Sequence, residues 1–141
     1  MAGRHRRRAQ PAPESLILDS GAVMALASGQ RRSRVFLAEA VAAGMQVLVP
    51  AVVVAETVRG DGARDAPVNR VLKAVEAILP VDEPVARTAG RLLGVSGSDA
   101  TIDALVVAAA LHIGGGRILT GDFEDLRRLS SGLDGVLVHP V

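Results

Sequence analysis

Four acidic side chains lie in otherwise apolar stretches of the sequence, and carboxylates are the ligands that bind a hard cation. Asp19 and Asp122 each follow a short aliphatic run, whereas Glu56 and Asp103 lie inside strongly apolar segments. The chain has no cysteine and only three histidines, none of which forms part of a metal-binding motif. Oxygen ligands without sulfur or imidazole select Mg²⁺ or Mn²⁺. Such an ion activates water and offsets charge on phosphate oxygens, so the acids indicate phosphodiester hydrolysis.

Asp19 and Asp122 are predicted to lie at the carboxyl ends of two strands. Residues 16–18 are three adjacent aliphatic residues with no polar face, which is typical of a strand buried on both sides of a parallel sheet. Residues 117–120 repeat this pattern before Asp122, and Thr120 adds a hydroxyl group beside the acid. Ligands of α/β proteins bind in the crevice at the carboxyl ends of the strands. An aspartate after a strand can also cap the following helix, and the sequence leaves this role of Asp19 open.

Glu56 and Asp103 are predicted to lie on helices that pack against the sheet. Glu56 follows five apolar residues in a predicted helix over residues 50–59. Asp103 is one turn into the most apolar predicted helix, residues 100–113. A carboxylate buried without a partner either becomes protonated or destabilises the fold, so Asp103 requires a cation or a polar neighbour. Asp99, at the entrance of the same helix, is expected to be its cap.

The predicted secondary structure alternates between strands and helices. Strands are expected at residues 16–18, 45–49, 78–81, 117–120 and 136–138. Helices are expected at residues 21–27, 35–43, 50–59, 67–77, 84–93, 100–113 and 123–129. Ser20 is the expected N-cap of the first helix, Pro50 the first residue of the third, and Gly94 the residue that ends the fifth. Such alternation is typical of a parallel α/β sandwich.

The composition is that of one domain preceded by a basic arm. Of the 141 residues, 49% are hydrophobic and 22% charged, which suffices for a hydrophobic core. Because the first ten residues contain four arginines and no acid, residues 1–14 are predicted to be a disordered arm and residues 15–141 the domain. With only two aromatic residues, base stacking is not an expected binding mode. No apolar stretch reaches the roughly 20 residues of a membrane span, and the lack of cysteine fits a reducing cytoplasm.

In order and spacing, these acidic stretches resemble the motifs of PIN domains, above all those of VapC-type toxins from bacterial toxin–antitoxin pairs. The resemblance rests on residues 16–20, on Glu56 within Val-Ala-Glu-Thr, and on residues 103–108 and 119–122. It implies a three-layer sandwich in which helices flank a central, mainly parallel sheet. It also implies a Mg²⁺- or Mn²⁺-dependent endoribonuclease that hydrolyses RNA phosphodiesters with metal-activated water. Such a protein is expected to be a cytoplasmic homodimer inhibited by a cognate antitoxin.

Carried over residue by residue, the resemblance implies a set of metal-binding and catalytic acids and a set of supporting polar residues. The first set is Asp19, Glu56, Asp103 and Asp122. The second set is Ser20, Thr120, Asp99 and Asp125. The basic arm departs from the family pattern, in which the first strand begins almost at the N-terminus. We also expect an antitoxin segment to lie in a groove near the acids, where it presents an arginine to them.

Three other functions are compatible with parts of this pattern. A phospho-receiver module needs a lysine at the end of a late strand, but the only lysine, Lys73, falls in a predicted scaffold helix. A haloacid-type phosphatase needs a second aspartate two residues after the nucleophile, where this chain has Gly21. A catalytically inactive PIN-like module that binds RNA or protein is the strongest alternative, because acids at these positions do not guarantee turnover.

Overall fold

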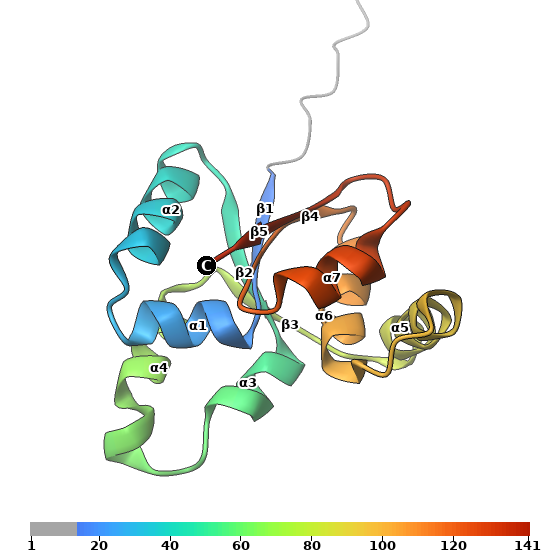
Figure 1. Cartoon of the computed structure of the whole chain (residues 1–141). Helices are drawn as coiled ribbons and strands as arrows, with labels where there is room; N and C mark the ends of the chain where they lie inside the picture. The colour runs from blue at the N-terminus through green and yellow to red at the C-terminus, as the bar shows by residue number, and fades with distance from the viewer. Residues whose placement is uncertain (1–13) are drawn as a thin grey trace, which may run out of the picture.

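The computed structural model describes residues 14–141, which form five strands in one sheet and seven helices (Figure 1). The strands are β1 (Ser15–Leu18), β2 (Gln46–Pro50), β3 (Ala77–Leu79), β4 (Gly116–Thr120) and β5 (Val136–Pro140). The helices are α1 (Ser20–Ala27), α2 (Arg31–Ala42), α3 (Ala51–Thr57), α4 (Gly62–Ala74), α5 (Glu83–Ser96), α6 (Thr101–His112) and α7 (Phe123–Ser130). The predicted basic arm falls on residues 1–13, which lie outside the described residues, so the division into arm and domain stays a prediction.

The aliphatic run at residues 16–18 forms the central strand of the sheet. The strand order is β3-β2-β1-β4-β5, and every neighbouring pair is parallel. Ile17 pairs with Leu48 of β2 on one side and with Ile118 of β4 on the other. Residues 16–18 are fully buried, as expected of a strand covered on both faces. The predicted parallel α/β sandwich is therefore confirmed, and the strands all present their carboxyl ends at one edge.

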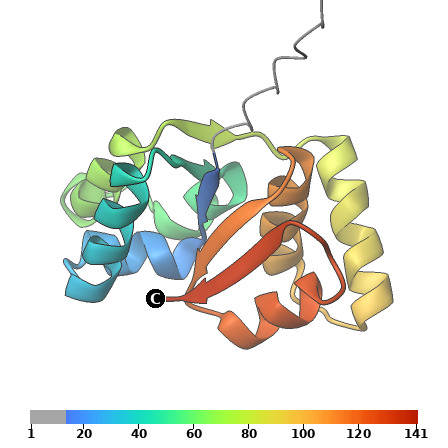
Figure 2. The same cartoon turned by 90° about the horizontal axis from the view of Figure 1, so that it is seen from above.

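Helices cover both faces of this sheet and make three layers. Helices α1, α2 and α4 lie on one face, and α6 and α7 lie on the other, with α5 packed on the outside of α6 (Figures 1 and 2). Helix α6 contributes a nearly continuous buried apolar surface from Val106 to Ala110. Among residues 14–141, no single helix is long and apolar enough to cross a membrane, and α5 and α6 meet that test only as a pair bent by 119°.

Helices α1 and α3 both begin at the carboxyl edge of the sheet, and their N-terminal residues differ from those that the sequence predicts. Asp19, and not Ser20, is the N-cap of α1, because its carboxylate accepts a hydrogen bond of 2.9 Å from the Ala22 N–H. Asp19 thus has the capping role that the sequence left open. Pro50 is the last residue of β2 and the N-cap of α3, so the helix begins one residue later, at Ala51.

Helices α4 and α5 are longer than the sequence predicts. Helix α4 begins at Gly62, well before Pro67, because the Asp61 carboxylate accepts hydrogen bonds of 3.1 Å from the N–H groups of Ala63 and Arg64. Helix α5 continues through Gly94 and ends at Gly97, whose φ of 68° is the left-handed conformation that closes many helices. The predicted end at Gly94 is therefore wrong.

Candidate metal centre

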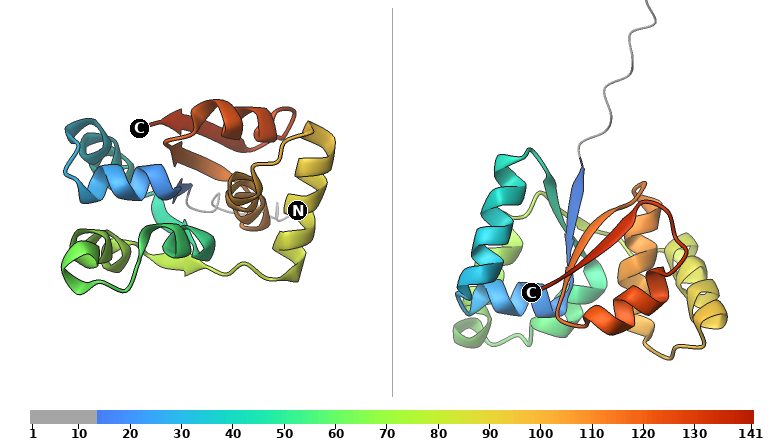
Figure 3. Two further views of the ribbon diagram at one scale, coloured as in Figure 1. Left: turned by 60° about the horizontal axis from the view of Figure 1, so that its bottom comes forward. Right: turned by 45° about the horizontal axis from the view of Figure 1, so that its top comes forward.

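Three of the predicted acids meet at the carboxyl edge of the sheet. Asp19, Asp103 and Asp122 each offer a carboxylate oxygen, and these oxygens lie within 4.8 Å of one another. Asp19 follows β1, Asp103 lies in the first turn of α6, and Asp122 follows β4. All three line a pocket of about 390 Å³, and Glu56 lines it too. The view from this edge in Figure 3 (left) shows α1, α3, α6 and α7 arranged around the strand ends.

Asp19 is the most firmly held member of this cluster. Only 3% of the residue is exposed, and its carboxylate accepts hydrogen bonds from the Ala22 N–H at 2.9 Å, the Gly121 N–H at 3.2 Å and the Thr120 hydroxyl. The Thr120 hydroxyl in turn accepts a hydrogen bond of 2.8 Å from the Asp122 N–H. Thr120 therefore connects the two strand-end acids, and Asp19 is oriented before any ligand binds.

A contact between two glycines allows the strand ends to come this close. A Cβ atom on Gly21, in the first turn of α1, would lie 2.6 Å from the Gly121 Cα and 2.8 Å from the Gly121 N. Real Cβ atoms do not approach backbone atoms so closely, so only glycine fits at this contact. The approach of the two backbones also brings the Gly121 N–H to Asp19. This role was not predicted from the sequence, although each strand-end acid has a glycine within two residues of it.

The centre carries negative charge that the described residues around it do not balance. Burial, followed by the charges of Asp122, Asp19, Asp125 and Glu56, raises the pKa of Asp103 to about 7. Burial also raises the pKa of Asp19, although hydrogen bonds from Thr120, Ala22 and Gly121 oppose that change. None of the described residues that line the pocket is basic. A cluster of oxygen donors with excess negative charge fits a hard divalent cation such as Mg²⁺ or Mn²⁺.

Glu56 and Ser20 face the same pocket but lie outside the three-carboxylate cluster. Glu56 is the penultimate residue of α3, and one of its carboxylate oxygens, Oε1, accepts a hydrogen bond from the Ser20 hydroxyl. Both residues line the pocket. The structure therefore brings Glu56 to the edge of the centre and leaves its side chain exposed.

The two remaining supporting residues occupy different places. Asp99 lines the pocket, but it does not cap α6, since the N-cap position is Ala100 and no side chain caps that helix. The expected capping role of Asp99 is therefore wrong, and only its backbone oxygen accepts a hydrogen bond, at 2.9 Å from the Thr101 N–H. Asp125 lies in the first turn of α7, outside the pocket lining, and acts on Asp103 through its charge.

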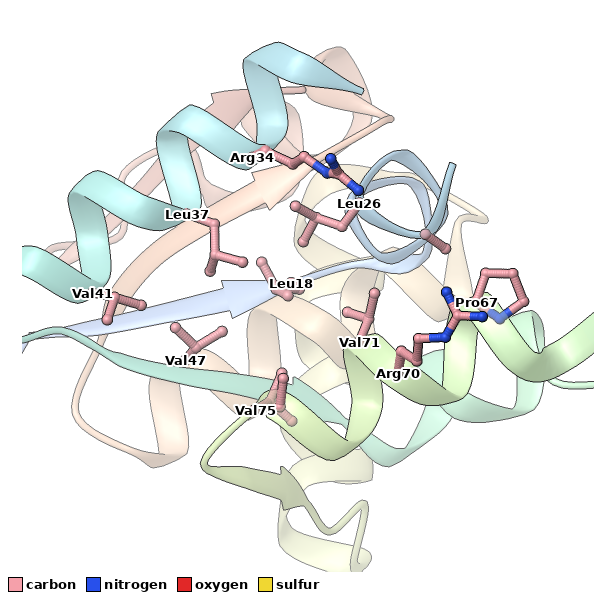
Figure 4. A pocket seen from close by; sticks show the side chains of 12 residues that line it. Leu18, Leu26, Arg34, Leu37, Val41, Val47, Pro67, Arg70, Val71 and Val75 are labelled. Atoms are coloured by element: carbon pink, nitrogen blue, oxygen red, sulfur yellow. The ribbon is translucent and has the colours of Figure 1, made fainter. Parts of the chain in front are cut away.

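A second, apolar pocket lies between α1, α2 and α4 (Figure 4). Its volume is about 380 Å³, and aliphatic side chains such as Leu37 and Val71 supply most of its lining. Two arginines, Arg34 from α2 and Arg70 from α4, also line it, on the side next to α1 (Figure 4). None of the acids of the metal centre belongs to this pocket. Leu18, the last residue of β1, lines this pocket, whereas the next residue, Asp19, lines the metal centre.

Comparison with known proteins identifies both the fold and the family. The family model described as "PIN domain" matches residues 16–131. A comparison with curated proteins finds no significant match. Among solved structures, VapBC2 from Rickettsia felis bound to a promoter DNA fragment has a TM-score of 0.69 at 14% identity, covering 89% of this chain and 98% of that chain. A toxin–antitoxin complex from Klebsiella pneumoniae has a TM-score of 0.66 at 20% identity, covering 90% and 100%.

A third similar structure is VapBC-5 from Mycobacterium tuberculosis, with a TM-score of 0.56, 22% identity, and coverage of 92% of this chain and 100% of that chain. At these identities the likeness establishes the fold. The match of the family model covers most of the sequence, including Asp19, Glu56, Asp103 and Asp122. The chain belongs to the PIN-domain family.

Proposed function

We propose that this PIN domain is a metal-dependent endoribonuclease, the toxin of a toxin–antitoxin pair. The observation that supports the proposal most directly is the meeting of three carboxylates from β1, α6 and the end of β4 within 4.8 Å. The raised pKa of Asp103 adds support, because it shows that negative charge accumulates where no basic side chain from the described residues lines the pocket. Solved structures with this fold include toxin–antitoxin complexes.

The acids have two roles in the proposed reaction. Asp19, Asp103 and Asp122 would hold Mg²⁺ or Mn²⁺, and Asp19 is already oriented by its hydrogen bonds from Ala22, Gly121 and Thr120. A bound divalent cation supplies Lewis acidity that activates water and offsets charge on the phosphate oxygens. Glu56 lines the pocket, and its Oε1 accepts a hydrogen bond from the Ser20 hydroxyl. In the proposed reaction, its second carboxylate oxygen would accept a proton from the attacking water.

The test is cleavage of a labelled RNA by the wild type and Asp103→Asn, with Mn²⁺ and with a chelator. We expect Asp103→Asn to keep the fold and lose cleavage by about 100-fold or more, since even residues behind a metal ligand contribute about 10- to 100-fold. Asp134→Asn, an exposed aspartate outside the pocket, is the matched control and should cleave normally. Full activity of Asp103→Asn would exclude this site, and RNA binding without metal-dependent cleavage would instead support an inactive PIN-like module.

We also propose that the apolar pocket between α1, α2 and α4 receives the cognate antitoxin. An amphipathic segment with acidic residues complements the aliphatic lining and the two arginines, Arg34 and Arg70. Val71→Glu should abolish inhibition by the product of the neighbouring gene while leaving RNA cleavage intact. Unchanged inhibition would place the antitoxin elsewhere.

The proposed homodimer is tested separately. We expect the mass of the purified protein in solution to correspond to two copies of the chain. A strictly monomeric mass, together with no association with the product of the neighbouring gene, would contradict both parts of the partner proposal.

A further inference from the structure

Asp65 is a buried carboxylate outside the metal centre whose hydrogen bonds all lead toward one end of helix α3. Only 2% of Asp65 is exposed. Its oxygens accept hydrogen bonds from the Arg59 N–H at 3.0 Å, the Gly60 N–H at 2.8 Å and the Arg64 guanidinium at 2.9 Å. Burial alone would raise the pKa of Asp65, but these hydrogen bonds outweigh it and lower the pKa, so the carboxylate is charged at neutral pH.

The arginines around Asp65 bind the carbonyl groups of the last turn of α3. The guanidinium of Arg64 that binds Asp65 also donates to the Thr57 carbonyl at 3.3 Å. Arg59, whose N–H binds Asp65, donates from its side chain to the Ala55 carbonyl at 3.0 Å and to the Val58 carbonyl at 2.9 Å. The final carbonyls of a helix have no partner within the helix itself. In α3, the side chains of Arg59 and Arg64 satisfy several of them, and Asp65 binds the Arg59 backbone N–H and the Arg64 guanidinium.

This matters for Glu56 because α3 is short. A helix of seven residues is not stable by itself, so its geometry depends on contacts with its surroundings. Glu56 lies between Ala55 and Thr57, whose carbonyls are the ones bound by Arg59 and Arg64. The carbonyls on either side of Glu56 are thus bound by two arginines, and Asp65 holds one of them by its backbone N–H and the other by its guanidinium. The Glu56 side chain reaches Ser20 and the pocket.

We propose that Asp65 is a positioning residue for Glu56: it holds the last turn of α3 in the place where Glu56 faces the metal centre. This inference rests on the proposed ribonuclease function, in which Glu56 takes part in the reaction. Asp65 itself lies outside the pocket lining and contacts neither the cation nor the RNA in this proposal. Its effect on catalysis therefore passes entirely through Glu56.

Asp61, the N-cap of α4, is a matched control for Asp65 in the first turn of the same helix. Its carboxylate accepts hydrogen bonds from the Ala63 and Arg64 N–H groups and so caps α4, but it makes no hydrogen bond to α3. Replacing Asp61 by alanine therefore weakens the same region of α4 without releasing the last turn of α3. A general loss of stability in this turn would affect both variants alike.

The experiment is a double-mutant cycle between Asp65→Asn and Glu56→Gln, read as kcat and KM for RNA cleavage. We expect Asp65→Asn to lower kcat by about 10- to 100-fold with little change in KM, the size expected for a residue that orients a catalytic group. In the Glu56→Gln background the same change should have almost no further effect, because both act through one side chain. Asp61→Ala should leave kcat unchanged.

Amide hydrogen exchange of residues 55–60 provides a readout independent of activity. Exchange should be faster in Asp65→Asn than in the wild type and unchanged in Asp61→Ala. If Asp65→Asn does not fold, Arg64→Gln removes the bonds to Thr57 and Asp65 and is taken through the same cycle. Additive effects on kcat, or unchanged exchange at residues 55–60, would overturn the inference. An inactive wild type would refute only the ribonuclease, since exchange at residues 55–60 still reports on Asp65.

Discussion

Asp103→Asn should stabilise the metal-free protein at pH 8, although it removes a proposed ligand. The pKa of Asp103 rises from 3.8 to about 7 on folding, through burial and the neighbouring acids. A raised folded-state pKa contributes stability below the unfolded value, and this contribution is lost as pH rises toward and through about 7. At pH 8 the folded chain must therefore hold an unfavourable carboxylate, and asparagine has nearly the same shape without the charge.

The size of this effect follows from the pKa shift after a correction for solvent. One pKa unit corresponds to about 1.4 kcal/mol, so the shift to about 7 would correspond to roughly 4 kcal/mol for a fully shielded group. Asp103 is only half-buried, and water and salt screen its neighbours, which reduces the expected gain to about 1–2 kcal/mol. In a domain of this size, 1 kcal/mol moves the melting temperature by about 3–5 °C. We expect Asp103→Asn to melt about 3–10 °C above the wild type.

The assay is thermal unfolding followed by circular dichroism, in chelator, at pH 3.5 and pH 8. At pH 3.5, below the unfolded value of 3.8, Asp103 is largely protonated in both the folded and the unfolded wild type, so the advantage of the variant should nearly disappear. Addition of Mn²⁺ at pH 8 should reverse the order, because binding at about 100 times Kd stabilises the folded wild type by about 2.7 kcal/mol. The melting temperature of the control variant Asp134→Asn should equal that of the wild type under each of these conditions. The reasoning is refuted if Asp103→Asn is less stable than the wild type in chelator at pH 8, or if its gain is equal at both pH values.

Two further predictions concern the contacts that hold the centre together. Gly21→Ala should lower stability by about 1–3 kcal/mol in a thermal melt, because the new Cβ meets the Gly121 backbone at 2.6 Å. Gly90→Ala, in α5 with open space around it, should instead stabilise by about 0.5–1 kcal/mol, and similar results for both would contradict the close contact. Thr120→Val should cost about 1–3 kcal/mol in denaturant unfolding, since it removes the hydroxyl hydrogen bond to the buried Asp19 carboxylate and leaves the Asp122 N–H without its partner. Thr120→Ser should restore most of that loss, and an unchanged Thr120→Val would show that the hydroxyl is dispensable.

Strands and buried helices were predictable because their signals are local. The aliphatic runs before Asp19 and Asp122 identify β1 and β4, and the apolar stretch around Asp103 identifies α6. The errors in helix boundaries arise where one capping residue outweighs the general preference of proline for helix starts or of glycine for helix ends. Pro67 was expected to start its helix, but the Asp61 cap starts α4 earlier and the proline is accommodated inside it. In α5, Gly94 is helical because the left-handed turn occurs at Gly97.

The site was predictable in its members but not in its contacts. Parallel strands bring their carboxyl ends to one edge, so Asp19 and Asp122 were expected to meet there. The hydrogen bond between Asp19 and Thr120 joins residues 101 positions apart, and no local pattern reveals it. The same holds for the contact between Gly21 and Gly121. Asp65 has no local signal in the sequence, because its burial depends on a loop that folds back onto α4.

The central position of β1 has a consequence for the order in which the chain is made. Synthesis proceeds from the N-terminus, so β1, β2 and β3 emerge before β4, and one edge of β1 has no strand to pair with until residues 116–120 appear. A growing chain that carries Asp19, Glu56 and Asp103 therefore has no three-carboxylate centre, because Asp122 and the Thr120 hydroxyl that orients Asp19 arrive with β4. The centre assembles only after residue 122 has left the ribosome.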